Sequence, residues 1–354
     1  MSEPRERWTD GVARYALRAA VVALPLATSL HEIALALLLA TVVISTLLRR
    51  NFSATAGAIA ERAPWIGAAL VFALCCLFGA LPHGNLHEGL GHAWLLTPLL
   101  AVPMADSSEK ESSTLTLLGL GAATTAALWG IAQRIGGAAA TAGFGHHLTL
   151  AYALIPAFAV SISQSRWSVA LVLGAGSLAT GSDAVPVALL VAAFAAFMGV
   201  KRPAAASNLP LALALGVAGN LGGMALFAVP DDLRQRAILW TGGLMVSPGG
   251  AGAGGYAAAT ERLYDALSPG FYFPNHAHDS AIQLYATLGP AGIAAMALLV
   301  ATILYKGHTG AAAGVAAVAI GGMTQDTCGD LEVARAAWMW VALLGARALP
   351  ETGQ

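Results

Sequence analysis

Charged residues are scarce in this sequence: Asp, Glu, Lys and Arg make up 10% of its 354 residues, against about 25% in soluble domains. The composition is 57% hydrophobic, and the mean hydropathy is +0.69. These values exclude an ordinary soluble globular domain and favour an integral membrane protein. Gly and Ala are abundant, which suits the close approach of helices in lipid.

Cysteine is also scarce, with three residues in the whole chain. Cys75 and Cys76 are neighbours in an apolar run and Cys328 is far away, so we expect no disulfide framework. The first apolar segment is followed at once by another, without a small-residue cleavage site and a polar mature domain. We therefore expect it to be a retained anchor rather than a cleaved signal peptide.

Apolar runs separated by polar or Gly/Pro breaks recur along the chain and predict transmembrane helices. Several runs are short for a hydrocarbon core of about 30 Å, so we expect about twelve spans within a range of 10–12. The fold class is then all-α, a polytopic protein with a single transmembrane helical domain over residues 1–354. The expected spans are 12–29, 31–48, 63–81, 89–104, 113–132, 147–163, 167–181, 185–200, 209–229, 279–304, 310–325 and 334–349.

The distribution of Lys and Arg predicts the orientation of these spans. With a cytoplasmic N-terminus and twelve spans, 13 of the 18 basic residues fall on the cytoplasmic side, and both termini are cytoplasmic. The longest connection, residues 230–278, then lies on the outer side. A long loop in a compact bundle is usually functional, so we expect the chemistry of the protein there.

The start of this loop predicts a short helix. Asp232, Arg236 and Trp240 recur at intervals of four residues, so they share one helix face. Trp favours the membrane interface, and an arginine beside it can bind a phosphate through its planar guanidinium. An interfacial helix without a ligand is the alternative.

Two further patterns follow in the same loop. Gly252 and Gly254 belong to a glycine-rich stretch that allows tight turns and close approach to a ligand, or forms a flexible loop. The stretch lacks the Lys-Ser/Thr ending of a phosphate-binding P-loop. His276, His278 and Asp279 lie at the mouth of a predicted span, where ionisable groups are costly unless used or solvated. A histidine there is a candidate general base, a polar cap or a zinc ligand, although no third ligand has the expected spacing.

Other polar residues are expected on the outer side. Arg134, before His146 and His147, is a possible second phosphate ligand or a solvated charge. Asp183 occupies a short turn, and Asp326 is a candidate partner for a histidine.

In order, these segments resemble the O-antigen ligase and O-antigen polymerase superfamily over roughly residues 140–300. Such proteins have an Arg four residues before a Trp, then Pro and Gly-x-Gly, then His-x-His-Asn running into a helix that contains Leu-x-x-Gly-x-x-Gly. Two departures stand out: Asp279 replaces the usual Asn, and Asp183 replaces an Arg that helps to hold diphosphate. Arg134, Arg234 or Arg335 would then have to take over the role of that arginine. The segments that carry the resemblance are 143–152, 180–182, 236–240, 248, 252–254, 276–279 and 288–292.

The resemblance implies glycosyl transfer at the periplasmic face of the bacterial inner membrane by a multi-pass protein. The donor would be a glycan on undecaprenyl diphosphate, and the acceptor lipid A-core or another glycan, with no nucleic-acid partner. His278 would accept the proton of the acceptor hydroxyl, and Arg236 would stabilise the leaving diphosphate. No Asp-x-Asp motif is present, so we expect neither a metal nor another cofactor. Substrate binding would involve Arg234, Arg134, Trp240, His276, Asp279, Gly252 and Gly254.

Several alternatives remain open from the sequence. Ligation of O-antigen to lipid A-core, O-antigen polymerisation and protein O-oligosaccharyl transfer use the same loop chemistry. A small-solute transporter or channel would need ionisable residues deep in the membrane and broken helices. Most ionisable residues here lie at loop edges, which disfavours transport. An inactive scaffold is kept open by Asp183.

Overall fold

The computed structural model describes residues 3–49, 63–104, 109–201, 214, 216–219, 230–246, 248–267, 276–306, 308–323, 327 and 330–345. Every regular element within these ranges is helical, which confirms the all-α class. The predicted span 209–229 lies mostly outside them, as do Asp326 and Cys328. The helices are α1 (Glu3–Ala23), α2 (Thr28–Arg49), α4 (Ile66–Ala80), α5 (Leu86–Trp94), α6 (Thr97–Met104), α7 (Glu109–Ile135), α8 (His147–Ser163), α9 (Trp167–Ala179), α10 (Val185–Lys201), α12 (Pro230–Leu244), α13 (Tyr256–Leu267), α14 (Ser280–Lys306), α15 (Thr309–Gly321) and α16 (Leu331–Gly345), with a 3-10 turn η1 at Leu81–His83.

One predicted span is divided in the structure. The apolar run 89–104 forms α5 and α6, with a turn between Trp94 and Thr97. Pro98 has no N–H to donate to the carbonyl of Trp94, and the hydroxyl of Thr97 donates to that carbonyl at 2.6 Å instead. A continuous span 89–104 is therefore wrong for this segment.

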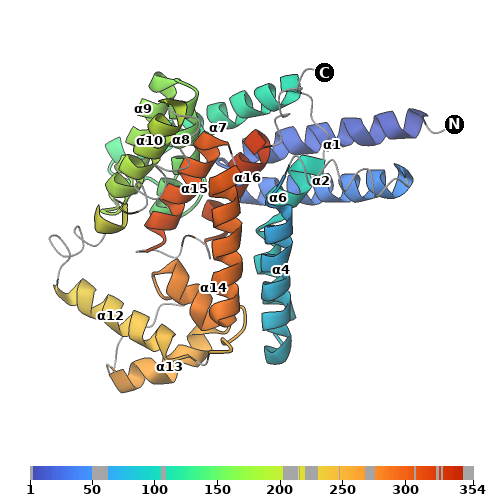
Figure 1. Ribbon diagram of the computed structural model, residues 1–354. Coiled ribbons are helices and arrows are strands. Elements are labelled where there is room, and N and C mark those ends of the chain that lie inside the picture. Colours follow the sequence, from blue (N-terminus) through green and yellow to red (C-terminus); the bar gives the residue numbers. More distant parts are fainter. Residues whose placement is uncertain are drawn as a thin grey trace.

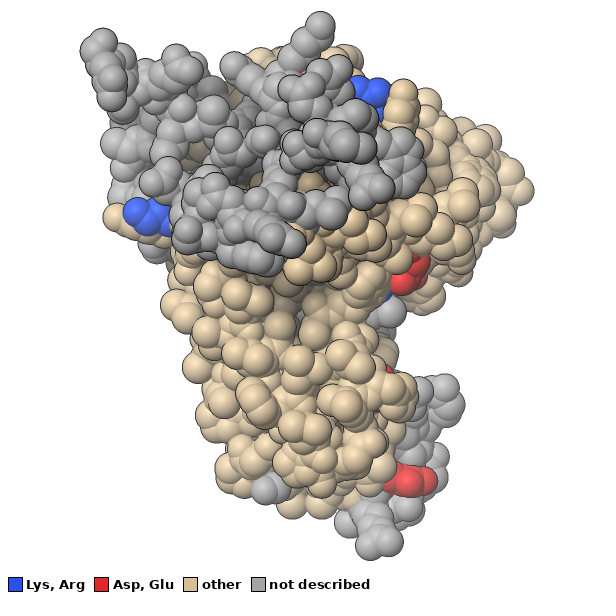
Figure 2. All heavy atoms as spheres, turned by 90° about the vertical axis from the view of Figure 1, so that its right-hand side faces the viewer, with Lys and Arg blue, Asp and Glu red and all other residues tan. Residues whose placement is uncertain are grey.

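Four helices are long and apolar enough to cross a membrane: Thr28–Leu47, Ile66–His83, Glu111–Ile135 and Ser280–Lys306. Shorter apolar helices are His147–Ser163, Trp167–Ala179, Val185–Met198 and Thr309–Gly321. Large apolar side chains such as Leu37, Leu74 and Leu298 are exposed on the long helices, as expected for surfaces that face lipid. Figure 2 shows one face on which the described charged side chains are few and far apart. The protein thus has the helices of a membrane protein, while the count of twelve stays a prediction.

The long helices do not share one direction. α1 and α2 lie side by side and run across the direction of α4 and α14 (Figure 1). Arg18 of α1 forms a two-point ion pair with Glu111 at the start of α7, at 2.8 and 2.9 Å. Because the two helix pairs cross, a single set of parallel spans does not describe this arrangement.

Small residues allow the central helices to approach closely. A Cβ on Gly176 of α9 would lie 2.6 Å from Ala127 of α7, and one on Gly314 of α15 would lie 2.7 Å from Pro156 of α8. Both distances are shorter than real Cβ contacts, so only glycine at these positions lets the two helices of each pair come this close. The abundance of Gly and Ala in the sequence is explained by such contacts.

Contacts between distant segments join parts of the chain that the Lys/Arg distribution assigns to the same side. Outer segments meet at Gly143 and Leu26, at Thr149 and Asp330, at Gly252 and His83, and at Gly254 and Glu88. Inner segments meet at Arg18 and Glu111, and at Gly310 and Ser163. The alternation of these segments across a membrane stays a prediction.

Candidate active site

The helices α12 and α13 of the predicted outer loop lie beside the lower end of α14 (Figure 1). The hydroxyl of Tyr264 donates to the carbonyl of Leu239 at 3.2 Å, and the hydroxyl of Tyr256 lies against it. Gly242 leaves the space in which the ring of Tyr264 packs. These buried contacts fix the C-terminal part of α12 and, with it, the helix face that carries Arg236.

The predicted helix at the start of the loop is present as α12. Arg236 and Trp240 are both half-buried, whereas Arg234 is exposed. The indole N–H of Trp240 is buried and has no hydrogen-bond partner within the described part of the chain. The side chain of Asp232 lies outside the described part, so its pairing with Arg236 stays a prediction.

A tight turn before α14 brings the two predicted histidines together. The ring centroids of His276 and His278 are 4.1 Å apart in an edge-on arrangement. The backbone N–H of His278 donates to Nδ1 of His276 at 3.3 Å, and His278 has a left-handed backbone with φ 52°. Because Nδ1 of His276 is an acceptor, its neutral ring carries the proton on Nε2 and offers an N–H donor there.

Asp279 caps the N-terminus of α14. Its carboxylate accepts from the N–H of Ile282 at 2.9 Å. Burial raises the pKa of Asp279, against the opposing effects of the N–H groups of Ile282 and Ala281 and of the positive charge of Arg236. The charge of Arg236 on α12 thus acts on the cap at the start of α14.

A residue at the start of α8 acts electrostatically on the histidine turn before α14. Burial, and then repulsion from His278 and His146, lowers the pKa of His276 to about 4 from its ordinary value of 6.5. His146 also lies against His147, with ring centroids 4.6 Å apart. His146, from a distant part of the sequence, therefore lies within electrostatic range of His276.

The pKa of His276 predicts how acid affects the fold. In the unfolded chain His276 takes up a proton near pH 6.5, whereas in the folded chain it does so only near pH 4. Acidification between these values therefore favours unfolding, and this contribution is absent above about pH 6.5. We expect His276→Gln to lose less thermal stability than the wild type between pH 7 and pH 5, measured as Tm in detergent. Equal losses in the two proteins would contradict this expectation.

α14 is broken at Gly289, whose φ of 67° and ψ of −167° lie outside the helical region. Pro290 follows and has no N–H for the carbonyl of Ala286. The N–H of Ala251 donates to that carbonyl at 2.8 Å, and the N–H of Gly252 donates to the carbonyl of Thr287 at 2.8 Å. The glycine-rich segment thus supplies the donors that the helix lacks at its break.

The positions of Gly252 and Gly254 are explained by contacts within the chain. Both have positive φ, at 80° and 72°. A Cβ on Gly252 would lie 2.7 Å from the ring of His83, and one on Gly254 would lie 2.7 Å from the side chain of Glu88. The predicted close approach occurs, but to η1 and to the first turn of α5. Contact of these glycines with a substrate stays a prediction.

Two predicted outer residues show no contact with the histidine pairs. Arg134 lies exposed in the last turn of α7, without an ion pair among the described residues. Asp183 lies exposed in the turn between α9 and α10. The predicted role of Arg134 in phosphate binding therefore receives no support from its position.

Sequence reasoning missed a buried ion pair between the first and last parts of the bundle. Arg335 of α16 is 2% exposed and pairs with Glu32 of α2. The indole N–H of Trp94 donates to the same carboxylate at 3.1 Å. Arg335 was a candidate for the diphosphate arginine missing at Asp183, but its pairing and burial give it a different environment. A glutamate within a predicted span was the signal that could have revealed the pair.

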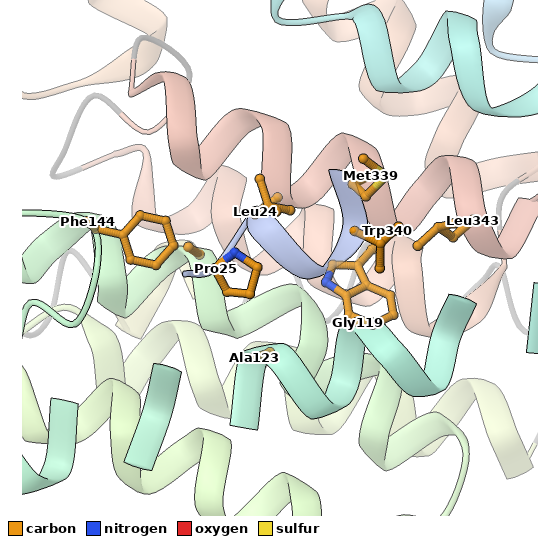
Figure 3. Close-up of a pocket in the computed structure, with 11 residues that line it drawn as sticks. Leu24, Pro25, Gly119, Ala123, Phe144, Met339, Trp340 and Leu343 are labelled. Atoms are coloured by element: carbon orange, nitrogen blue, oxygen red, sulfur yellow. The ribbon is translucent and has the colours of Figure 1, made fainter. Parts of the chain in front are cut away.

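The pocket in Figure 3 lies apart from these residues. It is apolar, and α1, α7, α8 and α16 contribute to its walls, with Phe144 at one end and Leu343 at the other. No residue of the histidine pairs and no arginine lines it. Within the described residues no group of three or more His, Cys, Asp or Glu side chains is arranged to hold a metal ion.

Neither a protein-family model nor a characterised protein matches this sequence. Function is therefore inferred from the residues that meet in space. These are two histidine pairs, a capping aspartate and a half-buried arginine, contributed by the start of α8, by α12 and by the turn before α14.

Proposed function

We propose that the protein is a metal-independent membrane glycosyltransferase of the O-antigen ligase type, acting at the periplasmic face of a bacterial inner membrane. It would transfer a glycan from undecaprenyl diphosphate to a hydroxyl of lipid A-core. The observation that carries this proposal is the contact between the rings of His276 and His278 in the turn before α14. The charges of His146 and Arg236 act on this turn through their electrostatic effects on His276 and Asp279. O-antigen polymerisation and protein O-oligosaccharyl transfer are variants of the same reaction with other acceptors.

The two histidines would divide the work on the acceptor. With its pKa near 4, His276 is neutral at pH 7, and its Nε2–H can donate to the acceptor oxygen. His278 would take the proton as the acceptor oxygen bonds to the anomeric carbon and the bond from that carbon to the diphosphate breaks. The leaving group is undecaprenyl diphosphate, so atoms and charges balance without an added reactant.

Arg236 would stabilise the negative charge that develops on the leaving diphosphate. Its half-buried position strengthens such an interaction relative to an exposed one. In the resting protein, Asp279 offsets part of the positive charge of Arg236. Arg234, which lies on α12 like Arg236 but is exposed, can add a second positive group. The membrane-facing helices would hold the polyprenyl chain.

A transporter for a small polar solute is the second candidate. The buried pair of Arg335 and Glu32 and the break in α14 are features that transport would use. The two functions differ in which residues they need. A transporter requires Glu32 and tolerates His278→Ala, whereas the transferase requires His278.

The experiment that tests the proposal is a lipopolysaccharide gel of the source bacterium with the gene deleted and then restored. Loss of the long-chain ladder with the core intact, and accumulation of undecaprenyl-linked polymer, would support ligation. A core that carries a single repeat would indicate polymerisation. An unchanged ladder would overturn O-antigen transfer and direct attention to another acceptor or to transport.

We expect transfer by the purified protein to continue after treatment with EDTA, because the proposed charge stabilisation comes from Arg236 rather than from a metal. The measurement is the rate of glycan transfer before and after chelation, with a metal-dependent glycosyltransferase as the control. Loss of activity that added zinc restores would instead favour metal binding by His276 and His278.

A further inference from the structure

The N-terminal half of α14, Ser280–Leu288, is held at both ends. At its start, the N–H of Ser280 donates to the carbonyl of Gly322 at 2.7 Å. At its end, the carbonyls of Ala286 and Thr287 accept from the segment 248–252, which we call the strap. The break at Gly289 separates this half-helix from the rest of α14. The hydrogen bonds from the strap therefore replace those that a continuous helix would make at this point.

The half-helix in turn holds the turn that carries the histidines. The side-chain oxygen of Gln283, in the first turn of α14, accepts from the N–H of Ala277 at 2.9 Å. Ala277 is fully buried between His276 and His278. A continuous series of hydrogen bonds and helix therefore leads from the strap to the backbone beside His278.

We propose that the strap is a positioning element for His278: it sets the place of the half-helix, and Gln283 passes that placement to the histidine turn. This inference rests on the proposed function, because the catalytic role of His278 belongs to that proposal. The strap itself touches no reacting atom. Its glycines are required because they let the backbone approach the broken helix.

Steric fit at Gly250 provides the test. Gly250 has φ 77°, and a Cβ there would overlap the carbonyl of Thr287. Gly137 has a similar φ of 82°, but a Cβ there would meet nothing within 4 Å. Gly250→Ala and Gly137→Ala therefore share the backbone strain, and only the first displaces the strap from the half-helix.

The first measurement is hydrogen exchange of the full-length protein in detergent. We expect the amides of Ala251 and Gly252 to be protected in the wild type and in Gly137→Ala, and to exchange at least ten times faster in Gly250→Ala. Pro290→Ala serves as a milder second variant, because Pro290 is exposed and alanine adds an N–H that competes with the strap for the carbonyl of Ala286 when the break at Gly289 closes. It should speed exchange at Ala251 while Tm stays unchanged.

The second measurement is the pH profile of glycan transfer, with kcat and KM determined separately. We expect Gly250→Ala to lower kcat at least tenfold, to change KM less, and to shift the profile, whereas Gly137→Ala keeps wild-type values. Fast exchange at the strap with unchanged kcat and pH profile would overturn the positioning role. An inactive wild type would overturn the proposed function, while protected amides that exchange faster in Gly250→Ala would still support the strap contact.

Discussion

Replacing His278 with alanine is expected to slow glycan transfer by about 10²–10⁴-fold, the range for losing a general base. The loss should appear in kcat, because His278 would act on the proton only as the acceptor attacks. The left-handed backbone at residue 278 adds strain for alanine, so His278→Asn is the better matched replacement. Asparagine tolerates this conformation and keeps a polar side chain but cannot take the proton at neutral pH.

The control for this prediction is His87→Ala. The side chain of His87 is 82% exposed and is paired with Glu88, in the segment between α4 and α6. We expect it to change the transfer rate by less than about twofold, since exposed pairs contribute little. Wild-type transfer by both His278→Ala and His278→Asn would exclude the acid–base mechanism proposed above.

Replacing Arg335 with methionine is expected to destabilise the protein by about 1–3 kcal/mol, the cost of leaving a partly buried polar group without its partner. This is less than the roughly 3–5 kcal/mol for a fully buried ion pair, because the side chain of Glu32 is 37% exposed and water can partly solvate its charge. Arg335 is 2% exposed and Glu32 would remain without its cation. The double variant with Glu32→Gln should recover most of the loss, because glutamine carries no charge and can still accept from the indole N–H of Trp94. Unfolding in mixed micelles as a function of denaturant provides the measurement.

A matched control for the buried pair is Arg18→Met. Arg18 pairs with Glu111 in a two-point contact, but its side chain is 40% exposed. We expect a smaller loss there, because the guanidinium of Arg18 lies partly in solvent. Equal losses for Arg18→Met and Arg335→Met would mean that burial of Arg335 adds nothing to its pairing.

Local sequence patterns predicted the helices well where the signal is short-range. The run 147–163 matches α8 residue for residue, because a polar turn and a polar end bound a continuous apolar stretch. The spacing of Arg236 and Trp240 predicted the helix now seen as α12. Proline chemistry predicts the division at Pro98 as well, although hydropathy alone gave a single span there.

Long-range relations were not available from such patterns. The glycines of the strap and the sequence around Gly289 both stood out, but nothing in either indicates that one fills the break in the other. In the same way, Arg335 near the start of an apolar run is equally compatible with a solvated loop and with a buried partner. Its partner Glu32 is 303 residues away, and no periodicity connects the two.

The separation of Glu32 and Arg335 along the chain also has a consequence for biosynthesis. At a translation rate of about 5–20 residues per second, roughly 15–60 s pass between synthesis of the glutamate and synthesis of the arginine. During that interval α2 has a carboxyl group whose eventual cation does not yet exist. Until α16 is synthesised, the α1–α2 hairpin must keep the carboxyl group of Glu32 hydrated or protonated. The final docking of α2 against α16 is therefore among the last steps of assembly.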